Sequence, residues 1–214
     1  AASPTSMVQG EAASGARARF GLADDHCAVV WIGRFSQRKN PLMLIRAIAR
    51  MNAAARCRFL FVGEGPLEEE MTETISKLGM ADRCRLVPFQ DDVRPVLQAA
   101  DLLVLTSREE SFGLVLVEAA AHRKPVVATR TQGPAEIVVD RETGVLVGTD
   151  DEAALAAAMD DLAAHPQKRE AMGRAAARRT AERFSPVENT RRIEAILAEV
   201  LGAGRRRKES SGKV

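Results

Sequence analysis

Short runs of apolar residues alternate along the chain with longer segments in which apolar residues recur every three or four positions. The short runs are typical of strands that are buried on both faces of a parallel sheet. The longer segments are typical of helices that cover such a sheet with one apolar face. The pattern predicts about six strands, at Cys27–Ile32, Arg58–Val62, Arg85–Pro88, Asp101–Thr106, Val126–Ala128 and Gly144–Val147. We therefore expect an α/β fold with a doubly wound, Rossmann-like parallel sheet.

Capping signals place the starts of several helices between and after these strands. Asn40, directly before a proline, is the predicted N-cap of the first of them. Asp91 or Asp92 is predicted to cap a short helix before the fourth strand. Thr149 and Glu152 have the spacing of a capping box at the start of an Ala-rich helix.

The two ends of the chain differ in composition from its middle. Residues 1–24 are rich in Ala, Ser and Gly, and predict a linker or disordered segment with a short helix at Ala12–Phe20. Residues 25–202 hold the sheet and the C-terminal helices, the last of which is predicted to begin at Ser185. Residues 203–214 form a basic tail, which we expect to be disordered, with contact to an anionic membrane as the alternative.

Length and composition restrict the classes of function. With 214 residues the chain can bury the core of one domain, and a net charge of +2 argues against nucleic acid as its main partner. One Trp and no Tyr leave no aromatic platform for stacked bases. Three scattered cysteines predict reduced thiols in a cytoplasmic chain, and no apolar run reaches transmembrane length. The chain starts without Met, which suggests a fragment or a processed product.

The segment between the fourth strand and the following helix holds the main candidate carboxylates. Glu110 lies in the predicted loop, where it can reach the hydroxyls of a ligand, and Glu118 lies in the helix, where it can bind a vicinal diol. Gly113 between them allows a ligand to approach the backbone closely. In the alternative, Glu110 is solvated and Glu118 complements the helix dipole. Ser107 is predicted to be a turn residue, and Asp101 to accept a hydrogen bond from a backbone N–H at the start of its strand.

The loop after the first strand is basic. Gly33 ends the strand, and Arg34, Arg38 and Lys39 follow it at a carboxyl end, where open α/β sheets bind ligands. Arg offers a planar fork and Lys a compact charge, and both suit a diphosphate. A solvated basic loop is the alternative. A signalling receiver domain would need an acidic pocket at this position, so the basic loop favours a phosphate-bearing ligand.

These features occur in the order of a known family. The Gly-Arg-x(4)-Lys loop comes first, the two glutamates with Ser-Phe-Gly between them come second, and Gly133 with Glu136 comes third. Together they resemble the C-terminal donor-binding domain of retaining glycosyltransferases with the GT-B architecture, of family 4, group 1 type. The chain departs from the family where Asn40 replaces a frequent glycine and where Gln132 replaces the first glycine of a pair. Glu136 is interpreted as a charge at the N-terminus of a helix rather than as a catalytic residue.

The resemblance implies roles for individual residues. Arg34 and Lys39 would hold the donor diphosphate and Glu110 would orient the donor sugar, so these three are the implied catalytic residues. The other residues implied to contact the donor are Gly33, Phe89, Phe112, Gly113, Leu114 and Glu118. Within this set Glu118 would hold the ribose and Phe89 would lie at the base.

The function implied is transfer of a sugar from a nucleotide-diphosphate sugar to an unknown acceptor, a sugar or a glycolipid, with retention of configuration. The departing phosphate would accept the acceptor's proton, so neither a general base nor a metal or other cofactor is expected. The acceptor would bind in an N-terminal lobe, which nothing before Cys27 supplies. One alternative is a non-catalytic nucleotide-sugar binding module or subunit. Another is a sugar-nucleotide epimerase, whose acid and base residues are not evident. Peripheral attachment to the inner face of a membrane is a further expectation.

Overall fold

A computed structural model of the protein describes residues 14–184 and the single positions 190, 194 and 197. The expected helix from Ser185 lies outside the described residues except at these positions, and residues 1–13 and the basic tail lie outside them entirely.

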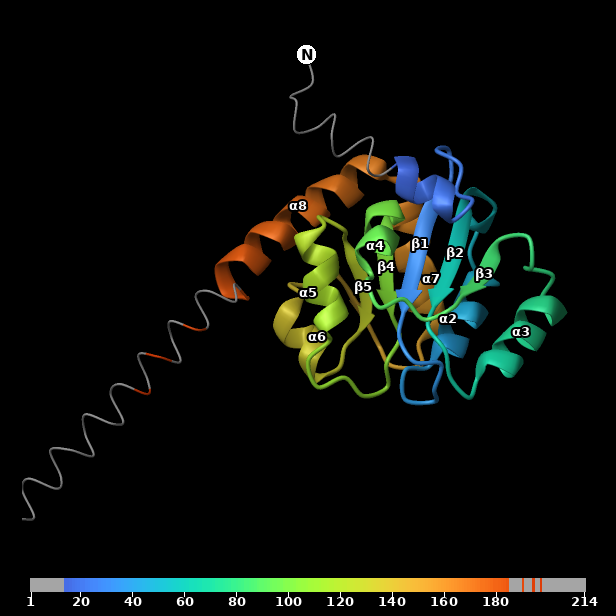
Figure 1. Ribbon diagram of the computed structural model, residues 1–214, viewed down its shortest axis with the longest axis horizontal. Coiled ribbons are helices and arrows are strands. Elements are labelled where there is room, and N and C mark those ends of the chain that lie inside the picture. Colours follow the sequence, from blue (N-terminus) through green and yellow to red (C-terminus); the bar gives the residue numbers. More distant parts are fainter. Residues whose placement is uncertain (1–13, 185–189, 191–193, 195–196, 198–214) are drawn as a thin grey trace, which may run out of the picture.

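The centre of the fold is a six-stranded sheet in which every neighbouring pair of strands is parallel. The strand order is β3-β2-β1-β4-β5-β6 (Figure 1). The strands are β1 (Cys27–Ile32), β2 (Cys57–Val62), β3 (Cys84–Val87), β4 (Leu102–Leu105), β5 (Val126–Thr129) and β6 (Gly144–Val147). The predicted doubly wound parallel sheet is therefore confirmed, and the strand boundaries differ from the predicted ones by one residue at most.

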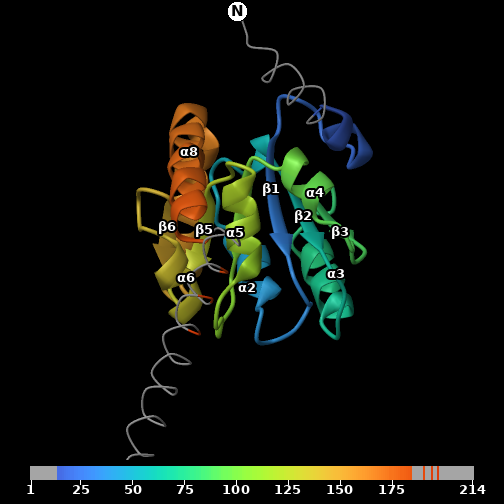
Figure 2. The same ribbon diagram turned by 60° about the vertical axis from the view of Figure 1, so that its left-hand side comes forward.

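Helices cover both faces of the sheet, and each face has its own apolar core. The helices are α2 (Pro41–Ile48), α3 (Glu68–Lys77), α4 (Arg94–Ala99), α5 (Leu114–Ala121), α6 (Gln132–Ile137), α7 (Glu152–Ala164) and α8 (Pro166–Arg183), with a 3-10 turn at Ala54–Arg56. Side chains of α2, α3 and α7 fill one core, and those of α4, α5 and α6 fill the other. Figure 2 shows α8 beside the β5–β6 end of the sheet. Among the described helices, none is both long and apolar enough to cross a lipid bilayer.

The strand order reverses between β1 and β4, which are neighbours in the sheet although two strands separate them in sequence. In doubly wound sheets the ligand site lies at this point, outside the carboxyl ends of the strands, because the loops after the two strands run in opposite directions. The loop after β1 and the loop after β4 are the two segments that the sequence marks with cations and carboxylates.

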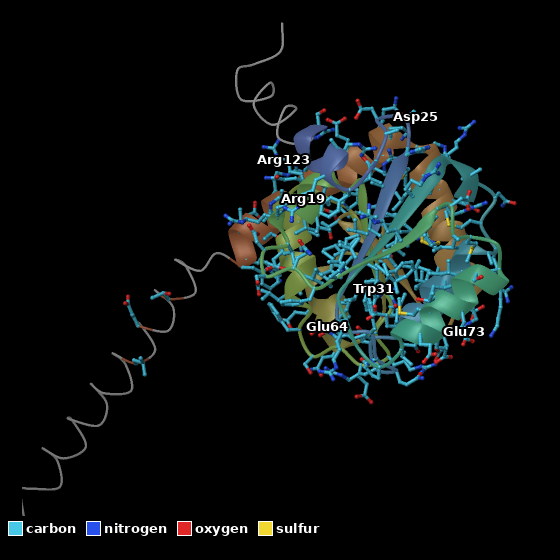
Figure 3. The ribbon with its side chains drawn as sticks, turned by 45° about the vertical axis from the view of Figure 1, so that its right-hand side comes forward. Arg19, Asp25, Trp31, Glu64, Glu73 and Arg123 are labelled. Carbon is cyan, nitrogen blue, oxygen red and sulfur yellow. The ribbon has the colours of Figure 1, made fainter. Side chains whose placement is uncertain are left out.

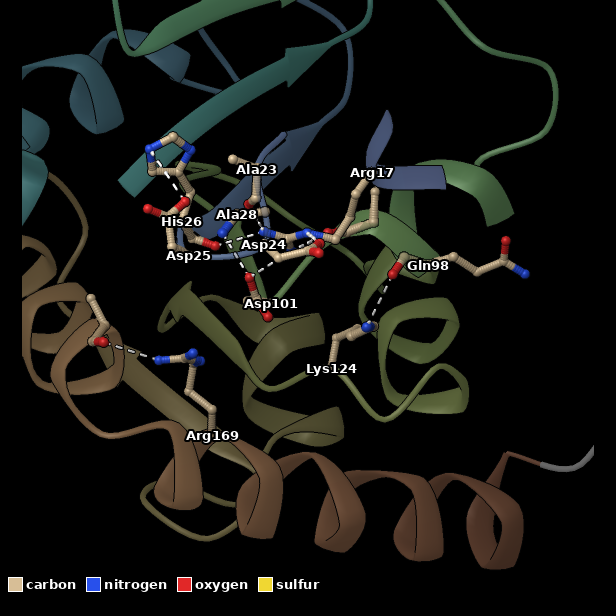
Figure 4. Close-up of polar contacts among 12 residues, drawn as sticks. Arg17, Ala23, Asp24, Asp25, His26, Ala28, Gln98, Asp101, Lys124 and Arg169 are labelled. Atoms are coloured by element: carbon tan, nitrogen blue, oxygen red, sulfur yellow. Dashed lines mark hydrogen bonds and ion pairs between the residues drawn. The ribbon is translucent and has the colours of Figure 1, made fainter. Parts of the chain in front are cut away.

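The described part of the N-terminal segment packs against the opposite, amino edge of the sheet. Residues 14–19 are helical, and Phe20 is buried in the core beneath α4. The Arg17 guanidinium donates to Asp101 Oδ2 at 3.1 Å and to the carbonyl oxygen of His26 at 2.7 Å (Figure 4). Asp101 also accepts from the backbone N–H of Ala28 at 2.8 Å, as predicted. From residue 14 onward, the segment expected to be a linker thus contributes to the folded domain.

Two of the predicted caps are wrong in their details. At α7 the side chain of Asp151, and not that of Thr149, accepts from the helix, at Ala154 N (2.9 Å). Glu152 is bound instead by Arg46 of α2 and by a neighbouring arginine. The capping box fails because Asp150 has a left-handed backbone (φ 59°) and so cannot be the first helical residue after Thr149. The helix begins two residues later, at Glu152.

At α2, Asn40 is at the predicted position but does not cap with its side chain. Its backbone is left-handed (φ 50°), and its amide points to another loop. Before α4, Asp92 Oδ1 accepts from Arg94 N at 3.0 Å, so the aspartate binds the first turn although Val93 is the N-cap residue.

Candidate functional site

The loops after β1 and β4 meet through an ion pair between two of the predicted site residues. Lys39 Nζ contacts Glu110 Oε2, and the two side chains are only 20% and 11% exposed. Ser107 Oγ donates to the same carboxylate oxygen at 3.1 Å. Among the described residues no hydrogen bond reaches Glu110 Oε1, so this oxygen is available to a ligand. The structure therefore brings Lys39 and Glu110 together at the carboxyl edge of the sheet.

Ser107 is a site residue that the sequence analysis took for a turn residue. It is fully buried, and its carbonyl oxygen accepts from Thr129 Oγ1 at 2.6 Å. Its backbone carbonyl group is thus held by β5, and its hydroxyl is held by Glu110. The available signal was a small polar residue directly after a buried strand, at the edge where ligands bind.

The two loops are also joined beneath the ion pair. The indole N–H of Trp31, which is fully buried (Figure 3), donates to Thr106 Oγ1 at 2.9 Å. The Thr106 hydroxyl lies 2.8 Å from the carbonyl oxygen of Asn40 and 3.0 Å from that of Lys39. The backbone N–H of Arg108 donates to the next carbonyl oxygen upstream, that of Arg38, at 2.8 Å. The position of Lys39 therefore depends on buried hydrogen bonds to the β4 loop.

Replacement of Thr106 by valine removes this junction while nearly keeping the volume of the side chain. It leaves the Trp31 N–H buried without an acceptor, and an unsatisfied buried donor costs about 1–3 kcal/mol. We expect Thr106→Val to lower the free energy of unfolding by that amount in a urea titration. Thr149→Val, at an exposed threonine, is the matched control and should be near neutral. Equal midpoints for the two variants would contradict the proposed role of Thr106.

A second part of the site is a cavity of about 270 Å³ beside the ends of β1, β2 and β3. It brings together Gly33 and Arg34 from the first loop with Phe89 beyond β3, a residue that is 59% exposed. Arg34 makes no ion pair among the described residues, so its charge is available. Glu64 after β2 also lines this cavity.

The start of α5 forms the third part. Gly113 is its N-cap residue and has a left-handed backbone (φ 87°), which glycine adopts at low cost. Phe112 and Leu114, on either side, have exposed side chains, and Leu114 is 63% exposed. Glu118 is half-buried one turn into the helix. No hydrogen bond or ion pair among the described residues joins Glu118 to the Lys39–Glu110 pair.

The N-terminal turn of α6 supports this loop from the other side. The backbone N–H of Gly133 donates to the carbonyl oxygen of Glu110 at 2.9 Å. A Cβ atom at residue 133 would lie 2.2 Å from the carbonyl oxygen of Phe112, so the loop and the helix approach each other as closely as glycine permits. Glu136 lies near the C-terminal end of α6 and is exposed, which corrects its interpretation as an N-terminal helix charge.

The resulting arrangement suits a ligand with phosphate groups and hydroxyls. Arg34 offers a cation that has no ion-pair partner in the described part of the chain, and Lys39 offers a cation shared with Glu110. The first turn of α5 offers the N–H groups of a helix N-terminus. Glu110 and Glu118 can accept hydrogen bonds from hydroxyls. Within the described residues, no cluster of three or more His, Cys, Asp or Glu side chains is placed to hold a metal ion.

Comparisons with known proteins give the arrangement a context. Residues 16–179 match the sequence model of the family described as Glycosyl transferases group 1. The lipopolysaccharide core biosynthesis glycosyltransferase LpsE of Rhizobium meliloti is 34% identical over 148 residues, which are 69% of this chain and 43% of that protein. The chain thus spans less than half of this relative.

Solved structures of glycosyltransferases have the same fold. The crystal structure of Anabaena Alr3699/HepE in complex with UDP and glucose matches with a TM-score of 0.82 and 27% identity, over 92% of this chain and 53% of that one. The C-terminal domain of a group 1 family glycosyl transferase (LpcC) from Francisella tularensis matches with a TM-score of 0.74 and 20% identity, over 80% of this chain and 92% of that one. At this identity the second likeness concerns the fold alone.

Proposed function

The chain belongs to the group 1 glycosyl transferases, and on this premise we propose that it binds the nucleotide-sugar donor of a sugar-transfer reaction. The observation that supports this most is the contact between Lys39 and Glu110, which joins a basic loop and an acidic loop where the strand order reverses. HepE, whose structure holds UDP and glucose, has this fold at 27% identity. The donor of the present chain would lie across the carboxyl edge of its sheet, where the loops after β1 and β4 meet.

Each part of the site has a proposed task. Arg34 and Lys39 neutralise the diphosphate, and this stabilises the charge that develops on the leaving group as the glycosidic bond breaks. Glu110 Oε1 accepts a hydrogen bond from a sugar hydroxyl while Oε2 is held by Lys39 and Ser107. Glu118 holds the ribose diol, and the base lies in the cavity beside Phe89.

We further propose the family 4 assignment, transfer with retention of configuration, and a reaction that needs neither a metal ion nor a general base from this chain. Because the chain spans about half of its relatives, the acceptor would bind to another lobe of a longer protein. A sugar or a glycolipid is the proposed acceptor. The basic residues near the C-terminus would favour a position at the inner face of a membrane.

Calorimetric titration with UDP, GDP and ADP tests the donor site. We expect one of the three nucleotides to bind, and Arg34→Ala and Glu118→Ala each to weaken that binding roughly tenfold, as the loss of about 1.4 kcal/mol would. Arg56→Ala is the control, because Arg56 is exposed in the turn before β2, at the opposite edge of the sheet. Binding that neither site variant changes would show that the site is assigned wrongly. Binding without sugar transfer by the longer protein would favour the alternative, a non-catalytic nucleotide-sugar module.

A further inference from the structure

Asp150, in the turn between β6 and α7, contacts both loops of the donor site. Its Oδ1 accepts from Asn40 Nδ2 at 2.8 Å and from Arg108 Nη2 at 3.0 Å. Arg108 Nε lies 3.2 Å from each of the two carboxylate oxygens. Asn40 directly follows Lys39, and Arg108 lies two residues before Glu110. The carboxylate of Asp150, from a third loop, therefore binds a residue close to Lys39 and a residue close to Glu110, the two partners of the ion pair.

The backbone at this contact is unusual on both sides. Asn40 and Asp150 both have left-handed conformations, with φ of 50° and 59°. Asn and Asp tolerate this region better than other non-glycine residues, and such conformations concentrate at functional sites. A glycine would adopt the same backbone at lower cost. An aspartate at residue 150 adds a carboxylate, and in the structure this carboxylate binds both loops.

The two hydrogen-bond partners of Asp150, Asn40 and Arg108, differ in how deeply they are buried. Asn40 is only 1% exposed, so its amide group depends on a protein partner. Arg108 and Asp150 are both exposed at the surface, where an ion pair by itself contributes little. An aspartate is charged at neutral pH, and the hydrogen bond from Arg108 holds the pKa of Asp150 further below its ordinary value. The Asn40 amide therefore has a permanent acceptor, kept in place by Arg108.

We propose that Asp150 is a positioning residue of the donor site, which acts through Asn40 and Arg108 to hold Lys39 against Glu110. This inference rests on the proposed function and adds to it a residue from a loop outside the predicted motifs. Without the carboxylate, the loop after β1 loses its link to the β6–α7 turn, although its buried bonds to Thr106 stay. A loop that must be ordered on binding reduces the affinity of its ligand.

Asp150→Gly tests the positioning role, because glycine suits the left-handed backbone and only the carboxylate is lost. We expect the dissociation constant of the bound nucleotide, measured by calorimetry with UDP, GDP and ADP, to rise roughly threefold to tenfold, which corresponds to at most about 1.4 kcal/mol. The thermal midpoint should fall, because the buried Asn40 amide loses its acceptor, although the lower cost of a left-handed glycine offsets part of this loss. Asp150→Asn, which keeps an oxygen acceptor for Asn40 and tolerates the same backbone, should restore most of the affinity.

Glu152→Ala is the matched control. Glu152 lies two residues further on and binds Arg46 and Arg50 of the α2 region, so its loss affects the packing of α7 on α2 without reaching the site loops. We expect this variant to lower the thermal midpoint and to leave the dissociation constant unchanged.

The outcomes separate the two levels of the proposal. If the wild-type chain binds none of the three nucleotides, the proposed function fails, and the positioning role falls with it. If the wild-type chain binds a nucleotide and Asp150→Gly binds it equally well, the positioning role is wrong while the proposed function stands. An equal loss of affinity in the control Glu152→Ala, which is destabilised without a change at the site loops, would likewise overturn the positioning role.

Discussion

Gly133→Ala is expected to abolish measurable nucleotide binding and to destabilise the fold. The new Cβ would lie 2.2 Å from the carbonyl oxygen of Phe112 and 2.5 Å from its carbonyl carbon, and neither backbone atom can rotate away. Alanine favours a helix over glycine by about 1 kcal/mol. Overpacking against backbone costs about 1–3 kcal/mol, so the clash wins. The loop before α5 must move away from α6, and this movement breaks the hydrogen bond from Gly133 N to the carbonyl oxygen of Glu110.

Two other glycines provide controls for this prediction. Gly15 is also helical, but a Cβ there would meet nothing within 4 Å, so Gly15→Ala should be neutral or stabilising. Gly173 in α8 would place a Cβ 1.9 Å from the carbonyl oxygen of Arg123, at the amino edge of β5. Gly173→Ala should therefore destabilise the fold in a urea titration without a specific loss of nucleotide affinity. Unchanged binding by Gly133→Ala would contradict the close contact of α6 with the donor loop.

Lys39→Ala is expected to raise the dissociation constant for a nucleoside diphosphate roughly tenfold to a hundredfold, since a hydrogen bond to a charged group contributes about 1.5–3 kcal/mol. It also leaves the Glu110 carboxylate, which is 11% exposed, without its counter-charge. The remaining hydrogen bond from Ser107 only partly compensates for this loss. We therefore expect the free energy of unfolding to fall as well, by about 1–3 kcal/mol.

A double variant separates the two effects of the Lys39 substitution. In the double variant Lys39→Ala with Glu110→Gln, residue 110 no longer carries an unpaired negative charge, so most of the lost free energy of unfolding should return. The affinity for the diphosphate should stay low, because the cation is still missing. Unfolding in urea and calorimetry on the same samples give both quantities. If affinity recovers together with stability, Lys39 acts only through the fold and does not bind the diphosphate.

The strands and the two loops of the site were predictable because their signals are local. A parallel sheet covered on both faces requires continuous apolar runs, and its ligand edge follows from the direction of the strands. Lys39 and Glu110 could therefore be assigned to one edge before the structure placed them in contact. The roles of Arg34, Lys39, Glu110 and Glu118 toward a donor rest on the family resemblance and remain predictions until binding is measured.

The residues that escaped prediction depend on contacts between distant segments. Ser107 reaches Glu110 from a buried position that β5 fixes, and the capping box at Thr149 gives way to the left-handed turn at Asp150. Asp150 binds Asn40 across 110 positions of the chain. No local pattern reports such a pair, because the spacing of the two residues depends on the length of everything between them.

Mapping of nucleotide binding by NMR tests the central claim most directly. Backbone amide shifts of the isotope-labelled chain would be followed during titration with UDP, GDP and ADP. The claim predicts that the largest shift changes lie at Gly33–Lys39 and at Glu110–Leu114, with smaller ones around Phe89. Changes confined to the groove between β6, α7 and α8, around Arg141 and Lys168, would contradict it.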